Sequence, residues 1–317
     1  MPYPKLSIII PVFNGGHYIS RCIESLINQS LKNSQIIVVD DGSRDDTSKI
    51  IQTYMTCSPN IELITHHENK GTGAARNTGL KHASGKYIAF LDADDWMDTN
   101  GYMEMVSALE HSSSDIAVCD VYTEYGSPYL SKIRYNYKYR NTITARFALR
   151  LLCKTEAQDS YMSSRMGNKV FRSELLLKNS ICFAERSVWE DDIFMFLAFY
   201  YAEKVELIPS VAEHYFQRDA SAMHSFSQSY IDHFINAFSE LKQVLETEET
   251  MGQYAEEYYA FLDRCLNSML DTLFSAETKV SVQRSYICYL LEKLLDSFTV
   301  KELMEYIDPH RLQRIWV

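Results

Sequence analysis

Three acidic side chains stand within four positions, at Asp92, Asp94 and Asp95, directly after the apolar run of residues 87–91. Carboxylates this close repel one another, so a folded protein tolerates them most easily where they meet a cation or accept hydrogen bonds. The apolar run indicates a buried strand, and open α/β sheets bind ligands at the carboxyl ends of their strands. An acidic turn in solvent is the plainer interpretation of an isolated Asp-x-Asp, so the choice depends on the rest of the chain.

A second group of carboxylates follows another apolar run, at Asp40-Asp41-Gly42. Carboxylates at the carboxyl end of a strand accept hydrogen bonds from a ribose or a base. Gly42 permits a tight turn with positive φ, and Thr47 is the expected N-cap of the following helix. An ordinary Asp-rich turn explains these residues equally well.

A glycine-rich segment from Gly71 to Gly79 opens a predicted helix over residues 72–83. Backbone N–H groups at a helix start bind anions, and Arg76, one turn in, offers a fork of donors to a phosphate. The dinucleotide-binding fingerprint fits poorly, because Arg76 stands at its third glycine position and the segment does not follow the first strand. A surface turn with a helix-facing arginine is the alternative.

Two later segments carry further candidates. Glu190-Asp191-Asp192 begins an apolar helical run. Acids there suit the positive end of the helix dipole, but a general base also requires a carboxylate at the reacting hydroxyl. His214 and His224 enclose a stretch with hydroxyls and a cation. Lone histidines are usually structural, whereas a histidine near carboxylates is a candidate metal ligand.

Short apolar runs alternate with helical patterns over about the first 120 residues, and this predicts an α/β fold. The predicted strands cover residues 6–12, 36–39, 61–65, 87–91 and 116–119, with helices over 17–30, from 47, over 72–83 and over 102–110. Because the strands are apolar throughout, they predict a mostly parallel sheet with helices on both faces. The pattern breaks over residues 121–140, and residues 143–201 indicate a helix, short elements and a second helix.

Residues 225–317 predict a C-terminal helical extension. Amphipathic helices are expected over residues 230–246, 254–274 and 283–298, the last with an apolar stripe of Ile287, Leu290, Leu291, Leu294, Leu295 and Phe298. We expect the stripes to close onto the rest of the protein. A second interpretation is self-association or membrane contact, because residues 310–317 mix cations with a tryptophan as peripheral anchors do. The extension's net negative charge argues against general membrane binding.

Bulk properties exclude several classes of protein. The chain has 317 residues, 46% of them hydrophobic, which suffices for one large domain or two smaller ones. A net charge of −11 argues against nucleic acid as a partner. The seven cysteines form no C-x-x-C pair, which indicates reduced thiols rather than a disulfide framework or zinc site. Neither a signal peptide nor a membrane-spanning stretch is expected.

The ordered motifs resemble the family-2 glycosyltransferases, inverting enzymes that use nucleotide-sugars and have a GT-A fold, a Rossmann-like α/β fold. The matching segments are residues 7–14, 38–43, 71–79, 90–95 and 190–194. The resemblance covers about residues 5–224. It implies a nucleotide-sugar-binding half at residues 1–120 and an acceptor-binding and catalytic-base half at residues 121–224. The helical extension, residues 225–317, lies outside it.

The resemblance also implies a role for each matching position. Asp92 contacts the ribose or the water shell of a metal, and Asp94 ligates Mn²⁺ or Mg²⁺ bridging the diphosphate. His224 is a second protein ligand of the metal, with His214 the weaker candidate. Asp191 deprotonates the acceptor hydroxyl. The donor-binding residues, which hold the base, the ribose or the phosphates, are Pro11, Phe13, Asn14, Asp41, Arg76, Asp92 and Arg218.

The implied reaction moves one sugar to a hydroxyl of a glycan acceptor, which is often lipid-linked. UDP-hexose or UDP-N-acetylhexosamine is the expected donor, with GDP-mannose and dTDP-sugars left open, and bacterial capsule, cell-wall or other surface-polysaccharide synthesis is the expected setting. The chain departs from many relatives in lacking a proline at 98–101 and in having the single Arg218 where they carry paired basic residues. These departures leave the phosphate contacts open. Asp95 is expected to be structural.

Two other functions remain to be weighed. A sugar nucleotidylyltransferase would need a basic, glycine-rich loop directly after the first strand, whereas Asn14-Gly15-Gly16-His17 holds no Lys or Arg. A non-catalytic nucleotide- or glycan-binding protein could lose the base, so Asp191 in its expected context argues against it. The expected location is cytoplasmic, with peripheral contact at the inner face of the cell membrane and homo-oligomers through the C-terminal helices as further expectations.

Overall fold

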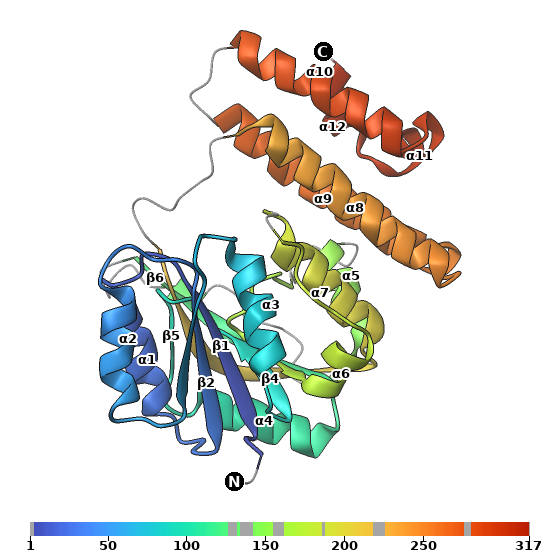
Figure 1. The fold of residues 1–317 in the computed structure, drawn as a ribbon. Coiled ribbons are helices and arrows are strands. Elements are labelled where there is room, and N and C mark those ends of the chain that lie inside the picture. Colours follow the sequence, from blue (N-terminus) through green and yellow to red (C-terminus); the bar gives the residue numbers. More distant parts are fainter. Residues whose placement is uncertain are drawn as a thin grey trace.

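The computed structural model describes residues 3–125, 132–133, 142–154, 162–185, 188–217, 226–275 and 280–316. An α/β domain holds the N-terminus, and a stack of helices lies beyond it at the other end (Figure 1). The strands are β1 (Leu6–Val12), β2 (Ser34–Asp40), β3 (Ile61–Thr65), β4 (Tyr87–Phe90), β5 (Trp96–Met97), β6 (Ile116–Glu124), β7 (Lys132–Ile133), β8 (Thr142–Thr144), β9 (Lys169–Arg172) and β10 (Lys204–Phe216).

The helices of the α/β domain are α1 (Ile19–Ile27), α2 (Thr47–Met55), α3 (Thr72–His82), α4 (Gly101–Ser112), α5 (Ala145–Cys153), α6 (Ser173–Lys178) and α7 (Glu190–Tyr201). The C-terminal helices are α8 (Gln228–Thr247), α9 (Met251–Ser275), α10 (Val280–Ser297), α11 (Val300–Tyr306) and α12 (Pro309–Trp316).

One sheet runs through the α/β domain in the order β3-β2-β1-β4-β9-β6-β10-β5. Strands β3, β2, β1 and β4 are parallel, and so are β6 and β10. This confirms the expected α/β fold with a mostly parallel centre. Strand β9 lies antiparallel between β4 and β6 and joins the two parallel parts. Strand β6 runs across residue 120 and continues to Glu124, so the same sheet spans both sides of that position.

Helices cover both faces of the sheet, as expected. Successive residues of β1 point to opposite faces. Ile9 packs in a core with the α3 residue Ala75, whereas Ile8 and Ile10 pack in a second core with Ile23 of α1. All of these side chains are buried. The mostly apolar, fully buried sequence of β1 therefore reflects two cores, one on each side of the strand.

Turn geometry at the end of β2 confirms one expectation and corrects another. Gly42 has a φ of +79°, which is the left-handed conformation expected of it. The prediction that Thr47 caps α2 is wrong, because Asp46 is the N-cap and Thr47 is the first helical residue. The Thr47 hydroxyl accepts a hydrogen bond of 2.9 Å from the Gly15 N–H and so ties this turn to the one after β1.

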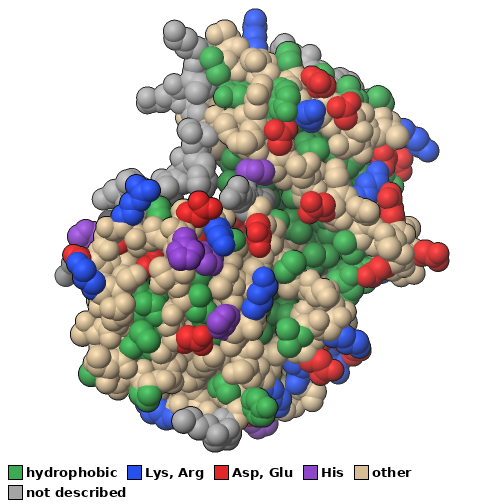
Figure 2. Space-filling model, in the orientation of Figure 1, with side chains coloured by type: hydrophobic (Ala, Val, Ile, Leu, Met, Phe, Trp, Pro, Cys, Tyr) green, Lys and Arg blue, Asp and Glu red, His purple; other side chains and the backbone are tan. Residues whose placement is uncertain are grey.

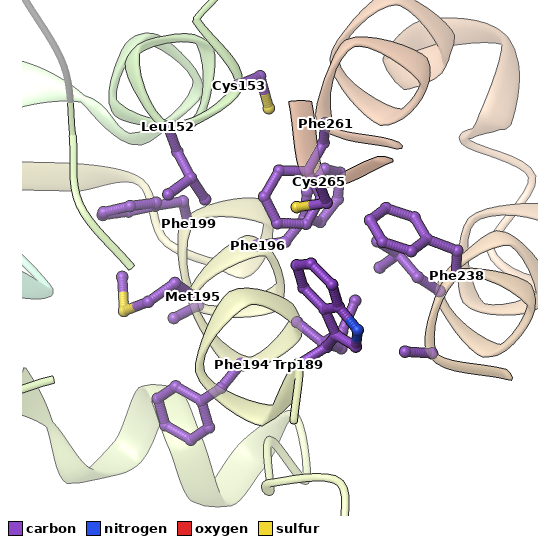
Figure 3. Close-up of a cluster of buried hydrophobic side chains, with 14 of the residues drawn as sticks. Leu152, Cys153, Trp189, Phe194, Met195, Phe196, Phe199, Phe238, Phe261 and Cys265 are labelled. Atoms are coloured by element: carbon purple, nitrogen blue, oxygen red, sulfur yellow. The ribbon is translucent and has the colours of Figure 1, made fainter. Parts of the chain in front are cut away.

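The C-terminal helices pack against the α/β domain through an aromatic core (Figure 3). The ring of Phe261 on α9 lies 5.2 Å from that of Phe196 on α7 and 5.5 Å from that of Phe238 on α8. Trp189, at the start of α7, lies 5.3 Å from Phe234 of α8. This confirms the expectation that the extension closes onto the rest of the protein.

The structure corrects part of the apolar stripe predicted over residues 287–298. Leu290, Leu294 and Phe298 are buried as expected, but Leu295 is 44% exposed. The cations near the C-terminus are engaged within the protein, since Arg311 pairs with Asp263 of α9 and Arg314 and Asp271 lie 2.9 Å apart. Among the described residues, no helix has the length and apolarity needed to cross a membrane.

Candidate active site

A pocket of about 400 Å³ lies where β1 and β4 end and α3 and α7 begin. Five of the residues predicted from sequence line it: Pro11, Phe13, Arg76, Asp92 and Asp94. Acidic, basic and histidine side chains gather on the side of the α/β domain nearest the C-terminal helices (Figure 2). The expectation that strand ends and helix starts converge on one site is therefore met by these five positions.

Arg76 is the centre of the charge network in this pocket. It is only 2% exposed, and its guanidinium donates to Asp92 Oδ1 at 2.9 Å and to Asp191 Oδ1. Glu190 Oε1 lies 3.8 Å from the same guanidinium. Although burial acts to lower the pKa of Arg76, Asp191, Asp92 and Glu190 raise it. A permanently charged arginine thus holds together acids that would otherwise repel one another.

The acids at the start of α7 have raised pKa values. Burial, with the charges of Asp92 and Asp192, raises the pKa of Asp191 to about 6, while Arg76 acts against this rise. Burial and the neighbouring Asp191 raise the pKa of Glu190 to about 8. A carboxylate with a pKa near 6 is ionised at neutral pH and is also a stronger base than an ordinary aspartate.

Asp41 holds the glycine-rich turn before α3 through hydrogen bonds to its backbone. Its carboxylate is 3% exposed and accepts hydrogen bonds from the N–H groups of Lys70 and Gly71, the latter at 2.8 Å. The His66 ring nitrogen Nδ1 lies 2.6 Å from Asp41 Oδ1. These two N–H groups stand just before α3, so the carboxylate fixes the turn that leads into the helix. Contact of Asp41 with a nucleotide base stays a prediction.

Asn14 joins the turns that follow β1 and β2. It adopts a φ of +50°, its N–H donates to the Ser43 hydroxyl at 2.8 Å, and its side-chain oxygen accepts from the Arg44 N–H at 2.9 Å. The preceding Phe13 is 48% exposed and lines the pocket. The turn thus presents an aromatic face to the pocket from a fixed backbone, and the base-binding role of both residues stays a prediction.

Asp94 is positioned through its backbone. The Arg21 side chain donates to the Asp94 carbonyl at 2.9 Å and stacks over Trp96, with 3.7 Å between the guanidinium carbon and the ring centre. His214 also stacks on Trp96. Its two ring nitrogens contact Glu124 at 2.8 Å and Asp98 at 3.1 Å. Since both ring nitrogens of His214 contact carboxylates, the structure does not support the prediction of His214 as a second-choice metal ligand.

Sequence reasoning missed a buried charge network behind the pocket. Arg165 contacts Asp95 and Glu213 at 2.6 Å each, and both acids are fully buried. Asp95 also accepts from the Phe216 N–H at 2.9 Å. Lys169 donates to the Arg165 carbonyl at 2.5 Å, and burial lowers the pKa of Lys169 to about 7. Glutamate and lysine inside apolar strands were the signal in the sequence.

Two predicted residues, Arg218 and His224, lie outside the described residues. Within the part of the chain that is described, no group of three or more His, Cys, Asp or Glu side chains is placed to hold a metal ion. Any metal would therefore draw its remaining ligands from elsewhere. His224 as a ligand and Arg218 as a donor contact both stay predictions.

Known proteins resemble this chain in sequence and in fold. EpsH of Bacillus subtilis (strain 168), assigned as a glycosyltransferase, is 27% identical over 83% of this chain and 75% of its own length. The poly(ribitol-phosphate) beta-glucosyltransferase of Bacillus spizizenii is 28% identical over 77% of this chain, although the match spans 37% of that longer protein.

A crystal structure of S. aureus TarS 1–349 in complex with UDP-GlcNAc shares the fold, with a TM-score of 0.75 and 22% identity over 93% of this chain and 82% of that one. The family model described as glycosyl transferase family 2 matches residues 7–175, more than half of the chain. The matched residues include the Asp41 turn, Arg76 and the acid cluster at Asp92. The chain belongs to glycosyl transferase family 2 and is a hexosyltransferase with the GT-A fold.

Proposed function

We propose that this enzyme is a metal-dependent, inverting glycosyltransferase that moves one sugar from a UDP-sugar to a hydroxyl of a glycan acceptor. The observation that carries the proposal is Arg76, which contacts Asp92 in the donor pocket and Asp191 at the start of α7. One buried cation thus fixes the distance between the donor and the candidate base. The relatives' names support UDP-N-acetylhexosamine or UDP-hexose as donors and surface-polysaccharide synthesis as the setting.

The residues at the pocket fit a divalent cation with oxygen ligands. Asp92 keeps 38% of its side chain exposed, and Asp92 and Asp94 both line the pocket. Mg²⁺ and Mn²⁺ favour carboxylate oxygens and commonly take one or two protein carboxylates, completing their coordination with phosphates and water. When bound, the ion would neutralise the charge that develops on the leaving diphosphate. A mannosyltransferase of the same fold, from Pyrobaculum calidifontis, is known in complex with GDP-Man and Mn²⁺.

In the proposed reaction Asp191 takes the proton of the acceptor hydroxyl. The hydroxyl oxygen then forms a bond with the anomeric carbon on the face opposite the diphosphate. The bond from that carbon to the diphosphate breaks, and its electron pair leaves with the diphosphate, which inverts the anomeric centre. Arg76 holds Asp191 in place and lowers its pKa. The family assignment favours this glycosyl transfer over nucleotidylyl transfer and over binding without catalysis.

A donor panel tests the proposal. The protein is incubated with Mn²⁺ and UDP-, GDP- and dTDP-sugars, and nucleotide release is measured without acceptor. We expect slow release from a UDP-sugar that chelation of the metal abolishes. A protein that neither releases nucleotide nor binds UDP or GDP in a metal-dependent way contradicts the proposal.

Two substitutions separate the roles of the acids. Asp94→Asn should weaken metal-dependent UDP binding, whereas Asp191→Asn should keep that binding and lose transfer. Asp46→Asn, in an exposed ion pair with Lys49, is the matched control and should change neither. Equal loss of UDP binding in the two site variants would show that the roles are misassigned.

The cytoplasmic location, the lipid-linked acceptor and homo-oligomers through the C-terminal helices remain proposals. The pairing of Arg311 and Arg314 with acids of α9 leaves fewer cations at the C-terminus for a membrane surface. Fractionation of cells that express the full chain would test the membrane contact. Release of the protein from membranes by salt is the result expected of a peripheral contact.

A further inference from the structure

A second and larger pocket, of about 770 Å³, lies between the start of α7 and the C-terminal helices α9, α11 and α12. Its size is within the range of roughly 300–1,000 Å³ that is typical of small-ligand sites. One wall is the first turn of α7, with Trp189 and Asp192, and the opposite wall is a face of α9, with Asn267, Ser268 and Thr272. The pocket is thus built by both parts of the protein.

The first residues of α7 contribute to both pockets. Glu190 lines the donor pocket and Asp192 lines the second pocket, so Asp191 stands between residues that face the two spaces. The same division recurs in the segment before β9, where Arg165 lines the donor pocket and Ser164 the second. A molecule in the second pocket would therefore lie against the same helix start that carries the candidate base.

The lining suits hydroxyl groups. Ser164, Asn267, Ser268 and Thr272 offer hydroxyl and amide groups, which donate and accept hydrogen bonds. The ring of Tyr306 also lines the pocket and is 37% exposed. An aromatic face beside polar side chains is the common composition of sites that hold a sugar's apolar and hydroxylated surfaces together.

The charges of the lining balance one another. Arg264 contacts Asp192 at 2.6 Å, and Arg311 pairs with Asp263. Among the described residues of the lining, the other charged side chains are Lys154 and Asp271, and Asp271 lies 2.9 Å from Arg314. A site for a chain of phosphates or uronates would need an excess of cations. The balance therefore favours an uncharged ligand.

We propose that the second pocket is the acceptor subsite and that it takes an uncharged oligosaccharide chain. The inference rests on the proposed function, because it assigns the acceptor of that same reaction. The chain would lie along the α9 face and extend past the start of α7, so that its terminal hydroxyl reaches both Asp191 and the donor sugar. The C-terminal helices would then complete the acceptor site as well as the core.

The test fills the pocket from its far wall. Ser268 is an exposed residue of α9 that lines this pocket and not the donor pocket, and Ser268→Tyr would place a ring in the space. Ser285→Tyr is the matched control, because Ser285 is also an exposed helical serine but lies on α10 and does not line the pocket. The full-length proteins, with Mn²⁺ and UDP, are applied to an array of neutral and anionic oligosaccharides, and donor hydrolysis is measured in parallel.

We expect the unchanged protein and Ser285→Tyr to bind neutral oligosaccharides, and Ser268→Tyr to bind them at least about tenfold more weakly with unchanged donor hydrolysis. Preference for anionic chains, equal binding by Ser268→Tyr, or no binding of any neutral glycan by a protein that hydrolyses donor would each overturn the inference. Loss of donor hydrolysis in the unchanged protein would instead contradict the proposed function. If Ser268→Tyr unfolds, Thr272→Phe, one turn away on the same face, repeats the test.

Discussion

At the scale of single residues, Arg76 determines how the acids of the site behave. It contacts Asp92, which faces the donor pocket, and Asp191, which is the candidate base. Removing such a cation would leave two neighbouring, partly buried negative charges unbalanced, and each would favour its protonated form. The arginine therefore keeps Asp191 ionised at neutral pH without lowering its pKa to that of an exposed aspartate.

The pKa of Asp191, about 6, predicts the acid side of the pH profile. Protonated Asp191 cannot accept the acceptor's proton, so kcat/KM for transfer should fall as the pH drops through about 6. Asp191→Asn should lower transfer about 10²–10⁴-fold, the usual contribution of a general base. Rates measured from pH 5 to 8 with saturating donor provide the check, and a profile that stays flat across pH 6 would contradict the assignment.

Replacing Arg76 should move that profile. In Arg76→Gln the charges of Asp92 and Asp192 still raise the pKa of Asp191, but the opposing charge is gone. We expect the acid limb of kcat/KM to shift to higher pH. Arg44→Gln is the control, because Arg44 is an exposed arginine of the turn after β2 whose hydrogen bond to Asn14 uses its backbone N–H. An unshifted limb in Arg76→Gln would mean that another group sets it.

At the scale of elements, the antiparallel strand β9 and the segment before it bring the buried charges together. Arg165 and Lys169 precede or begin β9, whereas Glu213 comes from β10 and Asp95 from the turn after β4. Pairing of β9 with β4 and β6 places these groups beside the donor pocket. The position of Arg165 beside Asp95 and Glu213 therefore depends on the place of β9 in the strand order.

Gly167 packs so closely against Glu213 that the site has no room for a side chain. A Cβ at Gly167 would lie 2.1 Å from Glu213 Oε1, so Gly167→Ala should displace the glutamate from Arg165. We expect a loss of about 1–3 kcal/mol in the free energy of unfolding, as for other overpacked sites. Gly252→Ala on α9 meets no atom within 4 Å and should stabilise by about 0.4–1 kcal/mol. Urea unfolding of both variants gives the comparison, and equal stabilities would contradict it.

The sequence predicts those elements whose signals are local. β1 is buried at every position and apolar at all of them except Ser7, so its pattern reveals the strand and the sheet type together. β10 was not foreseen, because it alternates burial, contains Glu206 and Glu213 and has register shifts against β6. The Arg165 network joins three segments through strand order, which no local pattern encodes. The contact between Arg76 and Asp191 likewise spans 115 positions.

At the scale of the whole molecule, the C-terminal helices share one core with the α/β domain. Buried side chains of α7, such as Phe196, and of α9, such as Phe261 and Leu266, form a single cluster that continues to Ile315 of α12. Because α7 also carries Asp191, its position depends on packing from the C-terminal side. A loss of that packing should therefore lower both the free energy of unfolding and the rate of transfer.

Phe261→Ala tests this coupling. Phe261 is fully buried between α7 and α8, so truncation should lower the free energy of unfolding by about 3–5 kcal/mol. Because the core is continuous, thermal unfolding should remain one transition that shifts to lower temperature, with transfer falling along the same curve. Phe274→Ala, on the same helix but 40% exposed, is the control and should cost much less. Two separate transitions in Phe261→Ala, with UDP binding retained through the first, would show that the helices unfold independently of the catalytic domain.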